Sequence, residues 1–310
     1  DVEYEQKGGC WTEPGDLTGT CFYPQIDIQN SNHDDNASPF LALRYKPTEE
    51  LTAYISVSQG FRSGGYNANL IQEGVPASVV VIDALSYLPT TVTHLDISFD
   101  SEETISYEAG VKVLFPSVGV SMNTGLFYII YDDFVVSEVV GSSFDANSGK
   151  AQIRGVEWSA DWRPMESLNL KGRVGYLDAK YTRFTTVGGE DFSGNRLTAS
   201  PEWDLSAQVD YRREIAPGLI GIAHGSYSYV DDYFTSANND PVLHKSPDTW
   251  RIDGKIGVEA QDGKWGVYLW GKNITDESKE EGVGVQSILG LARTQLAVPR
   301  SYGIEVLGRF

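Results

Sequence analysis

Two pairs of adjacent carboxylates, Asp132–Asp133 and Asp231–Asp232, are the residues whose types first suggest chemistry in this chain. Paired carboxylates serve as acid and base in glycoside hydrolysis, and carboxylate oxygens are preferred ligands of calcium. Both pairs follow runs of alternating apolar and polar residues, so they lie near the ends of expected strands. We interpret them as solvated charges at the rim of the fold, where strands end, rather than as a catalytic or metal site.

Motifs of catalysis and nucleotide binding fit this sequence poorly. The segment "NSGK" at 147–150 is not a phosphate loop, because Ala151 stands where that motif requires Ser or Thr. "GVGVQS" at 282–287 lacks the third glycine of a dinucleotide-binding turn, and no Gly-x-Ser-x-Gly nucleophile elbow occurs. We therefore expect no enzyme, no metal site and no cofactor.

Cys10 and Cys21 lie eleven residues apart in a segment rich in Gly and Pro. A local disulfide is the favoured interpretation, and it indicates an oxidising compartment. A structural zinc site would need histidines at suitable spacing, whereas the four histidines of the chain are scattered.

Composition and charge narrow the class of protein. The 310 residues include 32 Gly and 17 Tyr but only 2 Met, a balance typical of all-β proteins. A net charge of −19 argues against nucleic acid as a partner, because binding phosphates requires a basic surface. No apolar run approaches the ~18–20 residues of a membrane-spanning helix. "DVEYEQKGGC" does not resemble a signal peptide, so we interpret the chain as mature or as a piece of something longer.

The chain contains eleven segments in which apolar and polar residues alternate with the period of a β-strand. In "TWRIDGKIGVEA" (249–260), for example, Trp250, Ile252 and Ile256 share one face, and Arg251 and Lys255 lie on the other. The eleven expected strands are 39–47, 51–61, 104–115, 118–140, 150–164, 168–184, 201–215, 218–234, 249–261, 265–277 and 301–310.

The lengths of the strands and of their connections favour a membrane barrel over a soluble sandwich. Most strands exceed the ~5–6 residues usual in sandwiches, and crossing an outer membrane takes ~9–11 residues. The connections alternate strictly between short and long along the chain. The short ones are 46–50, 115–119, 163–167, 214–218 and 261–264, and the long ones are 62–103, 141–149, 185–200, 235–248 and 278–300. Short periplasmic turns and long extracellular loops produce this pattern, so we predict a transmembrane antiparallel β-barrel.

The same alternation orients the chain. The last strand runs inward and ends at Phe310 on the periplasmic side, while residues 1–38 form an extracellular segment with the predicted disulfide. Eleven strands would leave two open edges, which lipid does not tolerate, and bacterial single-chain barrels have an even number of strands. We therefore expect residues 39–310 to be the C-terminal half of a larger transmembrane barrel.

An ordered set of segments resembles the TonB-dependent outer-membrane receptors. These segments are "LTAYISVSQGFRSGGYNANL", "SYEAGVKVLFP", "NTGLFYIIYDDFVVS", "AQIRGVEWSADWRP", "GYLDAKYTRF", "GNRLTASPEWDLS", "LWGKNITDE" and "PRSYGIEVLGRF". The resemblance implies a barrel of about 22 strands, of which these are the last eleven, in the outer membrane of a Gram-negative bacterium. It also implies a plug domain and a TonB-binding box outside this chain. Phe310 is similar to the family's terminal assembly signal, which the outer-membrane insertion machinery recognises, and it also suits an interfacial aromatic girdle.

The resemblance implies that a ligand binds at the extracellular end of the barrel. The candidate residues are Arg62, Tyr66, Asn67, Tyr233, Phe234, Asn238, Asn239, Arg293 and Gln295. Arginine suits a carboxylate or an anionic iron chelate, and aromatic rings stack on sugars or planar chelators. Loop packing, contact with the plug or contact with lipopolysaccharide are alternative roles for each of them. The expected function is TonB-driven import of a ferric siderophore or similar chelate; a passive porin and an importer of carbohydrate or another nutrient are the alternatives.

Overall fold

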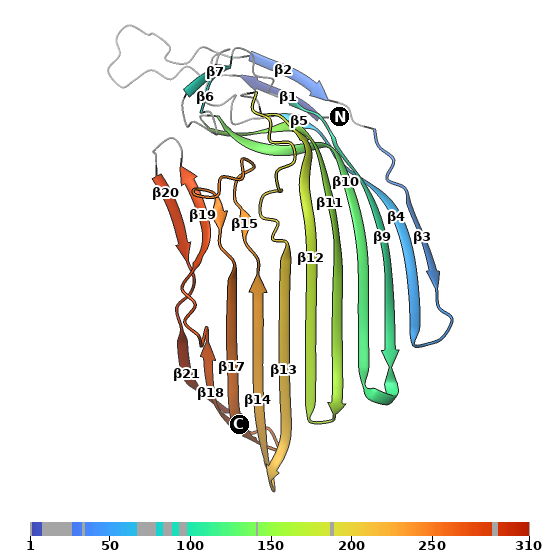
Figure 1. Cartoon of the computed structure of the whole chain (residues 1–310), viewed down its shortest axis with the longest axis vertical. Helices are drawn as coiled ribbons and strands as arrows, with labels where there is room; N and C mark the ends of the chain where they lie inside the picture. Colours follow the sequence, from blue (N-terminus) through green and yellow to red (C-terminus); the bar gives the residue numbers. More distant parts are fainter. Residues whose placement is uncertain are drawn as a thin grey trace.

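The computed structural model describes residues 2–7, 27–32, 35–66, 79–82, 89–92, 98–140, 142–186, 189–286 and 291–309. Most of these residues form one antiparallel sheet of eleven strands (Figure 1). Its strands are β3 (Phe40–Tyr45), β4 (Leu51–Arg62), β9 (Glu102–Phe115), β10 (Val120–Val140), β11 (Ser142–Met165), β12 (Leu168–Phe184), β13 (Trp203–Ala216), β14 (Leu219–Val230), β17 (Thr249–Ala260), β18 (Trp265–Lys272) and β21 (Ser301–Gly308). Each of the eleven predicted strands is therefore present, and the all-β antiparallel fold class is confirmed.

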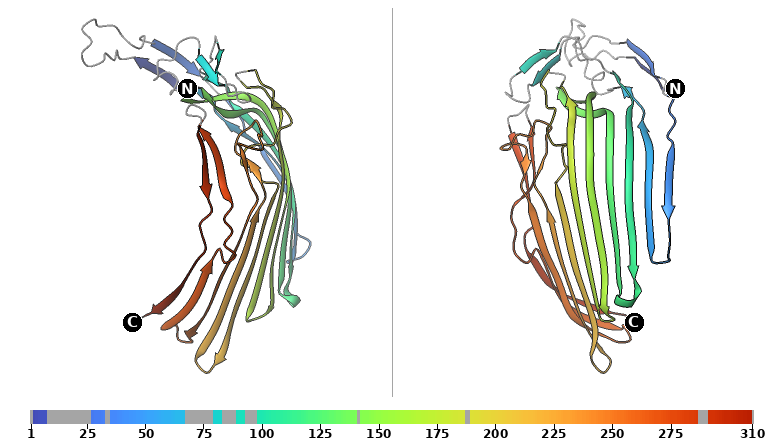
Figure 2. Two further views of the ribbon diagram at one scale, coloured as in Figure 1. Left: turned by 60° about the vertical axis from the view of Figure 1, so that its left-hand side comes forward. Right: turned by 45° about the vertical axis from the view of Figure 1, so that its right-hand side comes forward.

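The order of the strands in the sheet follows the order of the chain from β3 to β21, and every pair of neighbours is antiparallel. The sheet is strongly curved and open, with β3 and β21 as its edges (Figure 2). In the described part of the chain, no helix is long and apolar enough to cross a membrane.

The two ends of the sheet differ in the way expected from the connection lengths. Short turns close one end, and the turn before β10 contains the 3-10 helix η1 (Pro116–Val118) followed by Gly119 with φ 66°. The other end carries the short strand pairs (Figure 1). These are β1 (Val2–Lys7) with β2 (Asp27–Asn32), β5 (Gly65–Tyr66) with β8 (Ser98–Phe99), β6 (Val79–Ile82) with β7 (Pro89–Val92), β15 (Tyr233–Phe234) with β16 (Lys245–Ser246), and β19 (Glu280–Gln286) with β20 (Leu291–Leu296).

The segment 141–149 corrects one expectation. We predicted a long loop there, but β10 and β11 continue as a hairpin as far as the pair Val140–Ser142. The register shifts between Tyr131 and Val135, and Asp133 in this bulge adopts φ 52°. The valines of "FVVSEVV" favour a strand, and the bulge lets the hairpin bend as it continues past the regular part of the sheet.

The two faces of the sheet have opposite chemistry. On the apolar face, cross-strand neighbours such as Ile256, Leu269 and Ile304 lie side by side, and their side chains are 57%, 53% and 70% exposed. The polar face carries residues such as Lys255 and Glu305 at the alternate positions. An apolar face of this extent without a protein partner is typical of a lipid-facing barrel wall.

Candidate functional site

Ion pairs and hydrogen bonds between strands cross the polar face of the wall. Lys255 Nζ lies 2.9 Å from Glu305 Oε2, and the Tyr54 hydroxyl donates to Glu108 Oε1 at 2.5 Å. Nearer the short turns, Arg212 forms an ion pair with Glu259. Such a face suits a wet interior, because these charges have both a partner and access to water.

An apolar cluster covers the polar face where β10, β11 and β12 approach the loop end of the sheet. Tyr181 and Phe184 are buried at its centre, with ring centroids 4.6 Å apart, and Phe192 packs on Phe184 at 5.7 Å. The buried members are Ala151, Ala179, Tyr181, Phe184, Phe192, Leu197 and Ala237. The cluster joins the connections after β12 and β15 to the wall, because it includes residues of each.

The connection between β12 and β13 runs beside β12 like a further strand. The backbone N–H of Phe192 donates to Phe184 O at 2.8 Å, that of Tyr181 to Asn195 O at 2.9 Å, and that of Leu197 to Ala179 O at 3.0 Å. β13 itself pairs with β12 only as far as Tyr176. The connection therefore takes over the place of β13 at the loop end of the sheet.

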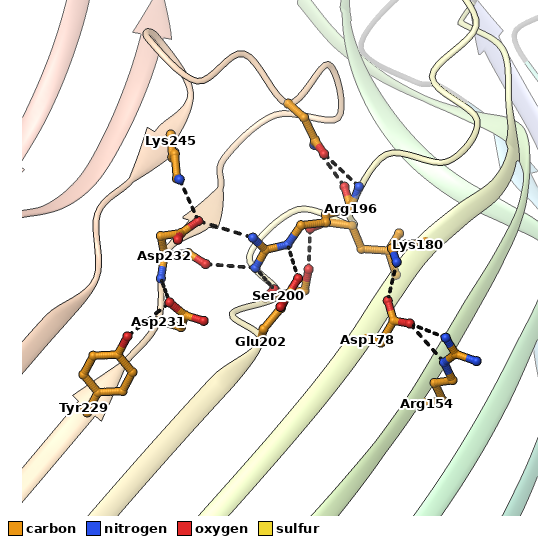
Figure 3. Close-up of polar contacts among 12 residues, drawn as sticks. Arg154, Asp178, Lys180, Arg196, Ser200, Glu202, Tyr229, Asp231, Asp232 and Lys245 are labelled. Atoms are coloured by element: carbon orange, nitrogen blue, oxygen red, sulfur yellow. Dashed lines mark hydrogen bonds and ion pairs between the residues drawn. The ribbon is translucent and has the colours of Figure 1, made fainter.

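Arg196 links this connection to the segment after β14 (Figure 3). Its guanidinium donates to Asp232 O at 2.9 Å and Ser200 O at 3.1 Å, and forms an ion pair with Asp232 Oδ2 at 3.3 Å. The same group lies over the Phe234 ring, 5.7 Å from its centroid. Lys245 Nζ completes the arrangement at 3.2 Å from Asp232 Oδ2. One arginine thus joins two segments through a side chain that is 18% exposed.

Asn239 adds a second link between the same two segments, which are the first connection, 185–202 between β12 and β13, and the second connection, 231–248 between β14 and β17. Its Oδ1 accepts from the Arg196 backbone N–H at 2.7 Å, and its Nδ2 donates to Arg196 O at 3.1 Å. Asn239 adopts φ 52°, a left-handed conformation that asparagine tolerates better than most residues. The side chain therefore fixes both the shape of the second connection and its position beside the first.

Local hydrogen bonds hold two titratable residues of the second connection, Asp240 and His244. Asp240 Oδ1 accepts from the backbone N–H of Val242 at 2.7 Å and of Leu243 at 3.1 Å, which holds the pKa of its carboxyl below the usual range. His244 Nδ1 lies 3.0 Å from Asn238 Oδ1. Burial lowers the pKa of His244, and the Asp240 carboxylate opposes part of that shift.

The two carboxylate pairs are rim charges, as expected, but partners surround them. Asp132 forms an ion pair with Lys150, and Asp231 accepts from the Tyr229 hydroxyl at 3.2 Å. Asp232 belongs to the Arg196 arrangement. Among the described residues, no group of three or more His, Cys, Asp and Glu side chains is arranged to hold a metal ion.

The structure places the candidate ligand residues on three separate parts of the loop end. Arg62 ends β4 on the polar face, exposed and opposite Glu102. Tyr66 belongs to β5, and Arg293 and Gln295 to β20.

Tyr233 and Phe234 form β15, which follows β14, and β14 lies six strands away from β4 and Arg62 in the sheet order. With Asn238 and Asn239 they are half-buried in the second connection, so this group alone is brought together. Asn67, Cys10, Cys21 and Phe310 lie outside the described residues.

Sequence reasoning missed two residues that organise the loop end, Arg196 and Asn273. Asn273 is 2% exposed with φ 48°, and its Nδ2 donates to Glu277 O at 2.8 Å and Val298 O at 3.0 Å. Both lie in segments that carried the family resemblance, "GNRLTASPEWDLS" and "LWGKNITDE". Their polar side chains beside strand ends were the available signal.

Comparison with known proteins identifies the family. The family model for the TonB dependent receptor-like β-barrel matches residues 12–274. The chain belongs to the TonB-dependent receptors. It is 26% identical over 201 residues to the pesticin receptor of Yersinia enterocolitica, and 28% identical over 136 residues to the ferrichrome outer membrane transporter/phage receptor of Escherichia coli K12. These alignments cover 64% and 44% of this chain, but only 25% and 17% of those proteins.

Solved structures of TonB-dependent receptors share the fold. The ferric yersiniabactin uptake receptor FyuA of Yersinia pestis superposes with a TM-score of 0.70 at 20% identity, over 92% of this chain and 39% of FyuA. The siderophore receptor PiuA of Acinetobacter baumannii gives 0.65 at 17% identity, over 91% of this chain and 37% of PiuA. The chain is thus an outer-membrane β-barrel segment of a Gram-negative bacterium, and its family consists of transporters and receptors.

Family membership also assigns the two faces. Barrels of this type have an apolar band toward lipid and a polar interior. The face of Ile256 and Leu269 is therefore the lipid-facing face, and that of Lys255 and Glu305 the lumen-facing face.

Proposed function

We propose that this chain forms the C-terminal half of the barrel of a receptor that binds a ferric siderophore or similar chelate and imports it with energy from TonB. Residues 1–38 would belong to an extracellular loop segment with a Cys10–Cys21 disulfide, and residues 39–310 to the barrel. The relatives named for pesticin, ferrichrome and ferric yersiniabactin support the role of receptor for this class of ligand. TonB would act through a region outside this chain.

The observation that carries the proposal is the position of Arg62. It ends β4 on the lumen-facing face at the extracellular end, where it is exposed. A guanidinium there faces the space that an entering ligand must pass, and it suits the carboxylate or hydroxamate oxygens of an anionic iron chelate.

We divide the remaining candidate residues by the contacts that they make. Phe234 and Asn239 are bound to Arg196, so we propose that they position the rim rather than contact the ligand. Tyr66, Asn67, Tyr233, Asn238, Arg293 and Gln295 stay candidates for direct contact. Gln295 is exposed in β20 and is the best placed of these for mutagenesis.

Uptake of radiolabelled ferric siderophores by cells that express the complete protein in place of their own receptors tests the proposal. We expect saturable uptake that stops when TonB is deleted. Uptake independent of TonB would indicate a passive porin, and TonB-dependent growth on an oligosaccharide without iron uptake would indicate a carbohydrate importer.

Arg62→Ala should weaken binding of the transported chelate by about tenfold or more, because a charge-assisted hydrogen bond is lost. Lys264→Ala is the matched control, since Lys264 is an exposed cation in a short turn at the opposite end of the sheet. Titration of the purified protein with the ferric chelate measures both. Equal affinities of the two variants would contradict a role for Arg62.

A further inference from the structure

The lipid-facing face carries a group of charges that neither the wall nor ligand import requires. Arg154, Asp178 and Lys180 lie on this face near its extracellular end (Figure 3). The Arg154 Nε and Nη2 groups donate to Asp178 Oδ2 at 3.0 and 2.7 Å, and Lys180 Nζ lies 2.9 Å from Asp178 Oδ1. Two cations therefore share one carboxylate, which leaves a net positive charge.

Aromatic side chains place these charges at the level of the lipid headgroups. Tyr128 lies directly opposite Arg154 in the register of β10 and β11 and stacks on Tyr107, with centroids 6.4 Å apart. Tyr176, two residues before Asp178 on β12, packs on Trp203 at 4.9 Å. Tyr and Trp gather at the boundary between hydrocarbon and headgroups, so the charges lie at this boundary and just outward of it.

The cations have the exposure and the free donors needed to bind an anion. The side chains of Arg154 and Lys180 are 70% and 48% exposed, whereas that of Asp178 between them is 13% exposed. Within the described residues, Arg154 Nη1 has no hydrogen-bond partner, and Asp178 takes up one of the three donors of Lys180. Asp178 thus holds two cations side by side and leaves their outer donors available.

An apolar groove begins beside this group. Leu41, Leu43, Ile55, Leu126 and Tyr128 line it on the same face, and its volume is about 520 Å³. Tyr128 joins the two features, because it lines the groove and lies opposite Arg154. A molecule with a phosphate next to acyl chains would satisfy both: the phosphate on the cations and a chain in the groove.

We propose that Arg154 and Lys180, held by Asp178, bind a phosphate of lipid A in the outer leaflet, with one of its acyl chains in the adjoining groove. Guanidinium and ammonium donors form strong charge-assisted bonds with phosphate oxygens. Cations on a lipid-facing surface are costly unless they reach the headgroup layer or find an anion. The proposal rests on the outer-membrane location of the protein and is independent of the ligand that it imports.

Binding of lipid A to the complete, delipidated protein in an uncharged detergent tests the proposal by native mass spectrometry. We expect bis-phosphorylated lipid A to bind at least tenfold more tightly than dephosphorylated lipid A or phosphatidylethanolamine. The double variant Arg154→Gln/Lys180→Gln should lose this preference, and Lys264→Gln, at the opposite end of the sheet, should keep it. Leu43→Gln, in the groove, should weaken both forms of lipid A equally.

Three outcomes would overturn the proposal. The first is equal lipid A binding by the double variant and the unaltered protein. The second is no preference for the phosphorylated form. The third is displacement of lipid A by millimolar inorganic phosphate, which would show a general anion site. A heat-modifiability gel confirms that each variant is folded, and Lys180→Gln alone serves if the double variant is not, since Lys180 is the outermost of the three residues.

Discussion

The wall and the rim of this barrel segment are built in different ways. In the wall, β14 and β17 pair without interruption from Leu219–Ala260 to Val230–Thr249, so backbone hydrogen bonds fix the structure. At the rim, the connections 185–202 and 231–248 depend on a few side chains, above all Arg196 and Asn239, and on left-handed residues such as Ala199. Regular pairing tolerates many side chains, whereas the rim depends on particular ones.

This difference matters for function because the two parts meet different demands. A closed ladder satisfies every backbone group inside a membrane, where no water replaces a lost bond. A rim that binds ligands must present irregular backbone and side chains outside the membrane, where water and local bonds satisfy them. Substitutions in the wall and substitutions at the rim should therefore destabilise the protein by different mechanisms.

The largest effect is expected in the apolar cluster of the rim. Phe184→Ala removes a buried ring that packs on Tyr181 and Phe192, and should cost about 3–5 kcal/mol of local stability. Hydrogen exchange of the amides at 191–199 in the complete protein should accelerate accordingly. Tyr302→Ala is the control, because that ring is 82% exposed on the wall. Unchanged exchange in Phe184→Ala would show that the backbone alone holds the connection.

A charge on the lipid-facing face of the wall should have the next largest effect. Ile256→Arg places a cation near the middle of the apolar face and should cost about 2–4 kcal/mol, whereas Lys255→Gln alters the adjacent lumen-facing position. The folded fraction in lipid vesicles, measured from the mobility of unheated samples on gels, compares the two. Equal loss of folding would reverse the assignment of the faces.

Removing Arg196 should loosen both connections of the rim together. Arg196→Ala leaves Asp232 without its guanidinium partner, and we expect a local loss of about 2 kcal/mol. Exchange should increase at 195–202 and at 231–235 in the same variant, while the wall strands keep their protection. Lys264→Ala, which breaks an exposed ion pair with Asp262, should change stability by only about 0–1 kcal/mol. An increase confined to one connection would contradict the linking role.

The smallest effect is a pH dependence of the second connection. The folded pKa of His244 is lowered by burial, so the unfolded state binds more protons in acid, and the stability due to neutral His244 is lost as the pH falls below about 6.5. Asp240, whose pKa is also lowered, loses its contribution only as the pH falls below its ordinary value of 3.8. The protection factors of the amides at 235–248, which correct for the slower intrinsic exchange in acid, should therefore fall between pH 7.5 and 5.5 in the unaltered protein but not in His244→Gln. A fall of equal size in that variant would point to another group.

The wall was predictable because its signals are local. Alternation of the kind seen in Trp250, Ile252 and Ile256 follows directly from the geometry of a strand in a two-sided wall. The hairpin at 141–149 was missed because Gly, Ser and Asn in this segment favoured a loop, whereas pairing with the valines of β10 extended the strand. Tertiary pairing outweighed local preference there.

The candidate site was predictable only in part. Phe234 and Asn239 were selected for ligand binding because of their types, yet their partners are Arg196 and its neighbours. Those partners lie 38 and 43 residues earlier in the chain, and no spacing rule connects loops so far apart. The position of Arg62 at the lumen-facing end of a strand was predictable, because it depends only on the alternation of residues within that strand.

The sequence by itself determined the regular strands of the wall and the face on which each of their side chains lies, because a period of two residues records both directly. The tertiary structure alone decided which residues meet at the rim and on the lipid-facing face. Arg196 reaches Asp232, and Arg154 and Lys180 share Asp178, only after distant strand ends and connections are brought together. The contacts of an irregular connection depend on the folded positions of its neighbours. The sequence of a single strand contains no information on those positions.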